Sequence, residues 1–331
     1  MIEQTKIYVS DSVCPYHNLA LEEYLLSLVE EKECILYLWQ NRQTVVIGRN
    51  QNAFKECKTE KLSEDGGTLA RRLSGGGSVY HDMGNLNFTF LVREEDYNVD
   101  RQISVIVQAL KYFGLHAEKT GRNDLCIGTK KFSGNAFYKH LGRCYHHGTI
   151  LVNVDLQKMT EYLHVSAEKL QSNSVSSVKS RVVNLKDLND DVNISDMRHA
   201  LIRGMGEVYA QEPTVISDDC LHSLKVKELK EKYASDEWIY GKRMKADFAV
   251  SHRYSWGDIT INLKIQGNVI SGVQVFSDAM DESISEVLTA HLIGARFQQK
   301  AIIDILRRIE GKLSPEILED IIVLLKNQEI W

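Results

Sequence analysis

Three consecutive glycines lie between a pair of arginines and a histidine–aspartate pair in the stretch 71–90. This stretch reads Arg-Arg-Leu-Ser-Gly-Gly-Gly-Ser-Val-Tyr-His-Asp-Met-Gly-Asn-Leu-Asn-Phe-Thr-Phe. Glycine has no Cβ, so a ligand can lie directly against the backbone N–H groups of Gly75, Gly76 and Gly77. Such N–H groups beside the cations Arg71 and Arg72 are typical of an anion-binding loop. A tight hairpin turn is the alternative for three glycines taken alone, but the charged neighbours favour a binding site.

A second polar stretch, 120–154, adds a carboxylate, two lysines and several amides. It contains the runs Gly121-Arg122-Asn123-Asp124, Lys130-Lys131-Phe132-Ser133-Gly134-Asn135-Ala136 and His146-His147-Gly148-Thr149-Ile150-Leu151. Together with the glycine stretch, these groups suit an anionic ligand such as a phosphate or a carboxylate. We expect loops and strand ends that gather at a site, with strand character only towards Val154.

Several better-known sites are excluded by the spacing. The glycine stretch does not end in Gly-Lys-Ser/Thr, as a Walker A loop does, and it lacks the spacing of the dinucleotide-binding fingerprint. The partner motifs of protein kinases are also missing. The pairs His81-Asp82 and His146-His147 are adjacent residues, which point to opposite faces of a strand, so we expect structural hydrogen bonds rather than a metal site.

Hydrophobic periodicity predicts the elements that must hold these residues. A first helix follows the start signals Asp11, Ser12 and Pro15, and its buried face is expected to comprise Leu21, Tyr24, Leu25, Leu28 and Val29. We also predict strands over 6–10, 68–70 and 85–92, a hairpin of the runs 34–39 and 44–48, and helices over 52–65, 100–113, 195–209 and 221–233.

The pattern changes near Lys245. Alternating runs at 248–254, 258–266 and 269–277 predict a meander of strands, and helices are expected over 284–293, 297–309 and 315–326. This order of strands and then helices predicts a separate, small α+β domain. We therefore expect two domains, a large one over 1–244 and a small one over 245–331.

The segment 170–185 contains five serines together with Lys179 and Arg181, and it has little apolar content. This composition predicts an exposed, mobile loop, with a plain surface linker as the alternative.

Composition narrows the class of protein. The 331 residues carry a net charge of −5, which argues against general nucleic-acid binding. The N-terminus lacks the apolar core of a signal peptide, and no apolar run is long enough to cross a bilayer. The six cysteines are scattered without a C-x-x-C pair, as in reduced cytoplasmic proteins. We expect a cytoplasmic protein that binds neither nucleic acid nor membrane.

The motifs together resemble the signature of lipoate–protein ligases. Arg-Arg-x-Ser-Gly-Gly-Gly-x-Val-x-His-Asp-x-Gly-Asn at 71–85 carries the resemblance, as do Gly-Arg-Asn-Asp at 121–124, Lys-Phe-Ser-Gly-Asn-Ala at 131–136 and His-His-Gly-Thr-Ile-Leu at 146–151. Ser-Val-Lys-Ser-Arg-Val at 177–182 is also similar to the family. The resemblance implies an α+β fold, in which a large catalytic domain like that of biotin and lipoate ligases has a mixed sheet flanked by helices.

The resemblance also implies a reaction in two steps. Lipoate and ATP first form lipoyl-AMP, with Mg²⁺ assisting, and the lipoyl group then passes to a specific lysine of an acceptor. The implied acceptors are lipoyl domains of 2-oxoacid dehydrogenase complexes, the H protein of glycine cleavage, or both. We expect the enzyme to act as a monomer that salvages free lipoate.

Individual roles follow from the matched motifs. Lys131 matches the family lysine that contacts the lipoyl carbonyl oxygen and the phosphate, and is the expected catalytic residue. Asn123 and Asp124 match adenylate contacts, and Asp124 is the expected Mg²⁺ ligand. The remaining implied nucleotide contacts are Arg72, Gly75, Gly76, Gly77, Ser78, Val79, Tyr80, Ser177, Lys179 and Arg181, of which the last three belong to a loop that would order over the adenylate.

Two other functions remain open on the sequence. An acyltransferase that needs no ATP would use a cysteine acyl-enzyme, and Cys126 and Cys144 lie near the lysine stretch. Most free cysteines are simply small buried side chains, however. A protein that binds lipoate or nucleotide without turnover is the third interpretation.

Overall fold

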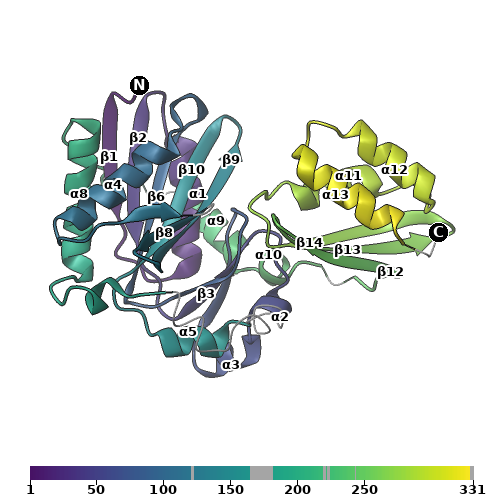
Figure 1. Cartoon of the computed structure of the whole chain (residues 1–331), viewed down its shortest axis with the longest axis horizontal. Helices are drawn as coiled ribbons and strands as arrows, with labels where there is room; N and C mark the ends of the chain where they lie inside the picture. The colour runs from purple at the N-terminus through teal and green to yellow at the C-terminus, as the bar shows by residue number, and fades with distance from the viewer. Residues whose placement is uncertain (121–122, 165–181, 219–220, 222–223, 243, 329–331) are drawn as a thin grey trace. The chain divides into compact units, whose positions relative to one another are not determined.

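The computed structural model describes residues 1–120, 123–164, 182–218, 221, 224–242 and 244–328 (Figure 1). By their internal contacts, the residues form two units. The first comprises Met1–Ile47, Phe54–Arg72 and Ser78–Ile239, and the second comprises Gly48–Ala53, Leu73–Gly77 and Tyr240–Trp331. The domain boundary between residues 244 and 245 remains a proposal.

The first unit is built on an eight-stranded mixed sheet, so the expected α+β architecture is confirmed (Figure 1). Two parallel pairings at one end give way to antiparallel pairings across the rest. In spatial order its strands are β11 (Thr214–Val215), β1 (Gln4–Val9), β2 (Glu33–Trp39), β6 (Asn85–Arg93), β10 (Arg143–Leu151), β9 (Lys130–His140), β8 (Asp124–Ile127) and β7 (Glu118–Thr120).

Helices α4 (Val99–Lys111) and α8 (Ile194–Tyr209) pack together on one face of this sheet, where they form the main apolar core. Both begin at asparagines, Asn98 and Asn193, whose side-chain oxygens accept backbone N–H groups of the first turn. Helices α1 (Pro15–Leu28) and α9 (Leu224–Ala234) pack against each other, and α1 also contacts β6 and β10.

The predicted buried face of α1 was partly wrong. Leu21, Leu25 and Val29 are buried, but Leu28 is 42% exposed. In its place the helix buries the polar side chains of Asn18 and Glu22. These two residues have hydrogen-bonding partners in the interior, which offset the cost of removing them from water.

The predicted hairpin of 34–39 and 44–48 was also wrong. Strand β2 pairs with β1 and β6, whereas β3 (Thr44–Ile47) lies in a second sheet between β4 (Thr68–Arg71) and β5 (Val79–His81). The link between β2 and β3 begins with two buried residues, Gln40 and Asn41, and continues through the exposed Arg42. Asn18 Nδ2 donates to the carbonyl of Gln40 and to Oδ1 of Asn41. The chain thereby passes from one sheet to the other.

Two further segments differ from their predictions. The single helix expected over 52–65 is two short helices, α2 (Ala53–Glu56) and α3 (Thr59–Glu64), because Cys57 between them forms a β-bridge with Leu163. The stretch 120–154 is mainly strand rather than loop: β8, β9 and β10 cover most of its described residues. Short elements complete the unit, namely α5 (Leu156–Tyr162), α10 (Asp236–Tyr240), and 3-10 turns at Glu94–Asp96 and Leu185–Asp187.

The second unit contains the predicted meander and helices. Strands β12 (Phe248–Tyr254), β13 (Gly257–Gln266) and β14 (Val269–Ser277) form an antiparallel sheet, and three helices cover one face of it (Figure 1). The helices are α11 (Ile284–Leu292), α12 (Gln299–Arg308) and α13 (Pro315–Lys326). Ser314 caps α13 by accepting the N–H of Ile317, as its Ser-Pro start predicts.

Most of the predicted loop 170–185 lies outside the described residues, which resume at Val182. Within the part of the chain that the structure describes, no helix is both long and apolar enough to cross a membrane.

Candidate functional site

Lys131 and Asp124 form an ion pair on the adjacent strands β9 and β8, with Nζ and Oδ1 2.6 Å apart. The register between these strands shifts after Leu125, so that Cys126 rather than Ile127 lies opposite Lys131. Without this bulge, Lys131 would share a face with Leu125, which belongs to the apolar core. The irregularity therefore turns the lysine to the same face as the carboxylate, where each side chain is about one-third exposed.

Gly134 makes room for the lysine. A Cβ at this position would lie only 3.0 Å from Lys131 Nζ. Sterics thus favour glycine at the last position of the Lys-Phe-Ser-Gly motif, because a larger residue would displace the ammonium group of Lys131.

Asn123 is fixed by Asn135 through three hydrogen bonds of 2.9 Å. The backbone N–H and the side-chain Nδ2 of Asn135 both donate to the carbonyl of Asn123, and Asn123 Nδ2 donates back to the carbonyl of Asn135. The next residue after Asn123 is Asp124. The structure therefore brings together four of the polar residues singled out in the sequence, from two separate motifs.

Gly75, Gly76 and Gly77 belong to the second unit. The structure gives a different explanation for glycine at each of the three positions. Gly76 has φ +85°, and its N–H donates to the carbonyl of Ala279. A Cβ on Gly75 would lie 2.5 Å from that same oxygen, so this glycine is required by packing. A Cβ on Gly77 would meet nothing within 4 Å. Of the three, Gly77 is therefore the one whose lack of a side chain the fold does not explain.

The two arginines also differ. Arg71 donates through Nε and Nη2 to the carbonyl of Ile239, while Trp238 Nε1 donates to the carbonyl of Arg71. This arginine has a structural role at α10, contrary to the sequence-based view of it as a cation for a ligand. Arg72 is buried and donates to the carbonyl of Val46; burial lowers its pKa to about 10, so the guanidinium remains charged at neutral pH.

Ser78 immediately precedes β5, and Tyr80 lies within it. Ser78 Oγ donates to a carboxylate oxygen of Glu56 at 3.4 Å. The Tyr80 side chain is 3% exposed and packs against the ring of Tyr162, and burial raises the pKa of its hydroxyl. Tyr80 is thus committed to the interior through its side chain. The expected contacts Ser177, Lys179 and Arg181 lie outside the described residues.

Sequence reasoning missed a buried polar cluster centred on Glu22. Its Oε1 accepts from Thr89 Oγ1 at 2.7 Å and lies 2.8 Å from His147 Nδ1. Trp39 Nε1 donates to the same threonine oxygen. The only sequence signal was a pair of polar residues four apart, Asn18 and Glu22, in an otherwise apolar helix face.

The buried histidines take part in hydrogen bonds, as expected, and burial lowers the pKa of both His81 and His146 to about 3. Asn41 Nδ2 lies 3.2 Å from His81 Nδ1. Among the described residues, no group of three or more His, Cys, Asp or Glu side chains is placed to hold a metal ion.

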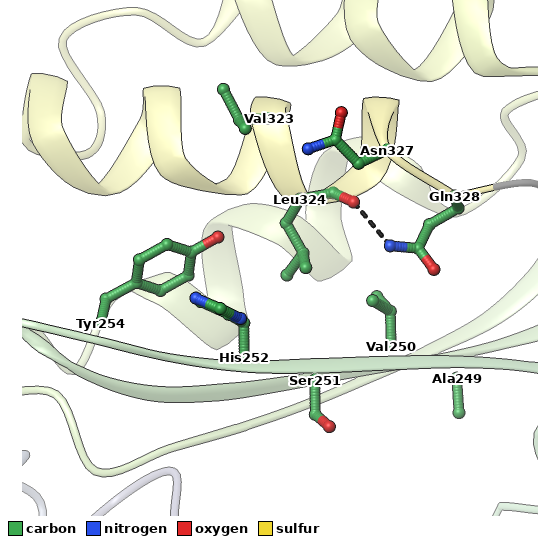
Figure 2. Close-up of a pocket in the computed structure, with 9 residues that line it drawn as sticks. All are labelled: Ala249, Val250, Ser251, His252, Tyr254, Val323, Leu324, Asn327 and Gln328. Carbon is green, nitrogen blue, oxygen red and sulfur yellow. Dashed lines mark hydrogen bonds between the residues drawn. The ribbon is translucent and has the colours of Figure 1, made fainter.

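A cavity of about 520 Å³ lies in the second unit, between β12 and the end of α13 (Figure 2). Figure 2 shows Val250, His252 and Leu324 pointing into it, while Ala249 and Ser251 point to the other side of the strand. Among the described residues that line it, none is a lysine, an arginine or a carboxylate.

Comparison with known proteins identifies the family. Residues 14–206 match the model of the lipoyl protein ligase A/B catalytic domain, and residues 243–325 match the bacterial lipoate protein ligase C-terminus. A lipoate-protein ligase A from Bdellovibrio bacteriovorus is 36% identical over 94% of each chain, and one from Psychrobacter cryohalolentis is 37% identical over 92% of this chain and 93% of its own.

Solved structures agree. Plasmodium falciparum LipL1 in complex with lipoate superimposes with a TM-score of 0.84 at 27% identity, covering 98% of this chain and all of that one. A lipoate-protein ligase A bound with ATP gives a TM-score of 0.60 at 27% identity over 73% of this chain and 99% of its own. Since two family models and full-length relatives match in the same order, this chain belongs to the lipoate–protein ligase family.

Proposed function

We propose that this protein activates lipoate with ATP and transfers the lipoyl group to a lysine of an acceptor protein, with Lys131 as the catalytic residue. The observation that carries the assignment is the Lys131–Asp124 pair beside the fixed Asn123, inside a chain whose relatives are lipoate–protein ligases. Relatives with lipoate and with ATP bound support both substrates.

In the first step, a lipoate carboxylate oxygen attacks the α-phosphorus of ATP, and pyrophosphate leaves. Both reactants are anions, so a fixed cation is needed to offset their repulsion as the new bond forms. Lys131 is suited to this task because its Nζ is partly exposed and is oriented by Asp124. The ammonium group acts by its charge and its N–H donors, and does not need to lose a proton.

In the second step, the amine of the acceptor lysine attacks the acyl carbon of lipoyl-AMP. An amide bond forms, AMP leaves with the electrons of the acyl–oxygen bond, and the amine releases its proton. Negative charge develops on the carbonyl oxygen and on the departing phosphate. We propose that Lys131 stabilises both, so that one cation serves both steps.

Mg²⁺ fits the residues present. This ion usually binds through one or two carboxylates together with substrate phosphates, rather than in an all-protein cage. Asp124 offers one such carboxylate, and no larger acidic cluster is found in the described part of the chain. When bound, Mg²⁺ would neutralise phosphate charge. We propose Asp124 as its protein ligand.

The nucleotide contacts proposed from the family motifs are Arg72, Gly75, Gly76, Gly77, Ser78, Val79, Tyr80, Asn123, Ser177, Lys179 and Arg181. The open space at Gly77 supports a close approach of phosphate to the backbone there. The buried side chain of Tyr80 leaves only its backbone for such a contact.

The proteins that accept the lipoyl group are proposed by analogy with a related ligase. A lipoate protein ligase of Thermoplasma acidophilum is described together with its E2 lipoyl domain, at 28% identity to this chain and a TM-score of 0.62, over 75% of this chain and all of its own. We propose lipoyl domains of 2-oxoacid dehydrogenases, the glycine-cleavage H protein, or both, as acceptors, and a cytoplasmic monomer as the working form.

The deciding experiment is exchange of labelled pyrophosphate into ATP with purified protein and Mg²⁺ but no acceptor. Exchange that requires lipoate supports reversible formation of lipoyl-AMP. Absence of exchange in folded protein, together with lipoyl or octanoyl transfer between carrier proteins without ATP, would contradict the proposal.

A further inference from the structure

A buried hydrogen-bonded chain connects helix α4 to the Asn123–Asp124 segment. His146 Nε2 lies 2.8 Å from Asn135 Oδ1, and His146 Nδ1 lies 3.1 Å from Gln102 Oε1. The side chains are almost fully enclosed: Gln102 is 1% exposed, His146 0% and Asn135 4%. None of these residues belongs to the ligand contacts proposed above.

The direction of each hydrogen bond can be derived. Asn135 uses its Nδ2 to donate to the carbonyl of Asn123, so its Oδ1 faces His146 and must accept. His146 therefore carries a hydrogen on Nε2. Burial lowers the pKa of His146 to about 3, so the ring is neutral at pH 7 and Nδ1 is an acceptor that needs a donor.

Gln102 supplies that donor once its amide is turned over. Its Nε2 is buried without a hydrogen-bond partner while its Oε1 faces the ring nitrogen. The oxygen and nitrogen of an amide are interchangeable in shape, and their assignment follows from the hydrogen bonds they make. With the amide rotated by 180°, Nε2 donates to His146 Nδ1, and both ring nitrogens have partners of the correct kind.

Packing holds the imidazole ring in one orientation. The rings of Phe137, Phe88 and Phe90 lie 5.1, 5.4 and 6.0 Å from it, centroid to centroid. Gly148 keeps the adjacent space open, since a Cβ there would lie 2.9 Å from Asn135 Oδ1. The ring can thus direct its Nε2–H at one acceptor only.

We propose that His146, supported by Gln102, is a positioning residue for the adenylation step. Its Nε2–H fixes the orientation of the Asn135 amide, which then holds Asn123 and keeps Asp124 in register beside Lys131. The imidazole moves no proton in the reaction. The expected change in kcat rests on the proposed function, because it is measured in lipoate adenylation. The expected loosening of the Asn123–Asp124 segment does not depend on that function.

The test compares two substitutions. His146→Phe keeps an aromatic ring among the three phenylalanines but removes the donor, whereas His146→Gln retains an N–H donor near the position of Nε2. We expect His146→Phe to lower kcat for lipoate-dependent pyrophosphate exchange about tenfold or more, with the KM for lipoate nearly unchanged, because a buried acceptor loses its donor. His146→Gln should stay within about threefold of wild type.

A second readout needs no activity. Hydrogen–deuterium exchange of a peptide spanning 123–127 should be about tenfold faster in His146→Phe than in wild type, and close to wild type in His146→Gln. If His146→Phe fails to fold, Gln102→Met serves instead, with the same direction of change. Wild-type protein that exchanges no pyrophosphate and transfers acyl groups without ATP would contradict the proposed function, but it would leave this structural readout to decide the inference.

If kcat falls equally in His146→Phe and His146→Gln, the positioning role is overturned, because the N–H donor kept by the glutamine would then make no difference. Unchanged kcat and unchanged deuterium exchange in His146→Phe would overturn it as well. The pH profile of kcat gives a further check: it should be the same in His146→Gln as in wild type. Loss of one limb of that profile would instead make His146 an acid or base.

Discussion

Lys131 Nζ lies 2.6 Å from Asp124 Oδ1, and the register between β8 and β9 shifts by one residue between the pairs Leu125–Ser133 and Cys126–Lys131. The pair is one-third exposed on both sides, so it contributes at most about 1 kcal/mol to folding. Its value lies in orientation. The cation points out of the apolar core, and a Cβ at residue 134 would press on its ammonium group at 3.0 Å.

Lys131→Ala should lower lipoate adenylation by about 100-fold or more, because the group that offsets developing negative charge is removed. The thermal unfolding midpoint should stay nearly unchanged, since an exposed ion pair adds little stability. Lys130→Ala is the matched control: this neighbour is exposed, and its removal should leave the rate close to wild type. A Lys131→Ala enzyme with near-normal pyrophosphate exchange would reject the assignment.

Asp124→Asn should raise the Mg²⁺ concentration needed for half-maximal adenylation on the order of tenfold, because one anionic ligand becomes neutral. The amide keeps the shape of the side chain, so the fold should persist. Rates measured across a Mg²⁺ titration at saturating ATP give the comparison. If the titration curves of variant and wild type coincide, Asp124 is not the metal ligand.

Gly77→Ala and Gly75→Ala should have opposite consequences. A Cβ at Gly77 meets open space, so the variant should unfold like wild type but bind ATP about tenfold more weakly, as the methyl group enters the space proposed for phosphate. A Cβ at Gly75 would clash with the carbonyl oxygens of Ala279 and Met280, which should cost about 1–3 kcal/mol of stability. Calorimetry measures both properties. Normal ATP affinity in Gly77→Ala would remove this glycine from the site.

Acid should destabilise the protein partly through His81 and His146. Their pKa values of about 3 in the folded state lie below the ordinary value of 6.5, so between these limits the unfolded chain binds protons that the native protein does not. The contribution of the two histidines to the free energy of unfolding is therefore fully present above pH 6.5. It falls as the pH drops below 6.5, by about 1.4 kcal/mol per pH unit for each histidine.

His146→Gln tests this point. The loss of unfolding free energy between pH 7 and pH 5.5 should be smaller by about 1 kcal/mol than in wild type, because one titrating group is gone. Urea unfolding at the two pH values provides the measurement. An identical loss in both proteins would mean that His146 already binds a proton when folded.

Cys126→Ala and Cys144→Ala should both retain ATP-dependent adenylation. The Cys126 thiol is 8% exposed and lies 2.9 Å from Thr120 Oγ1, while Cys144 is fully buried in the apolar core of the sheet. Neither is placed as an accessible nucleophile. Acyl transfer that proceeds without ATP and disappears in either variant would favour the cysteine-dependent transferase.

The local elements of the second unit could be predicted from the sequence because each is specified by nearby residues. The meander alternates with the period of a strand and is broken at glycine-containing turns, and Ser314 with Pro315 starts the last helix. Short-range patterns of this kind do not depend on distant parts of the chain. The separate motifs that contain Arg72, Lys131 and His146 likewise indicated the family from the sequence alone.

The interior of the first unit depended on tertiary structure. Asn18 and Glu22 look misplaced in an apolar helix until Gln40, Asn41, Thr89 and His147 surround them. The runs 34–39 and 44–48 look like a hairpin because they are apolar and adjacent, yet they lie in different sheets, and Asn18 holds the buried first half of the link between them, Gln40 and Asn41.

The sequence by itself therefore indicated the family and the candidate residues for its chemistry, because residue types and their spacing are local properties. Only the tertiary structure decided which of these candidates lie in contact. Lys131 meets Asp124 through a bulge between strands, Arg71 is drawn to the carbonyl of Ile239, and His146 is joined to Gln102 across 44 positions of the chain. Such contacts arise from strand register and burial, which no local pattern encodes.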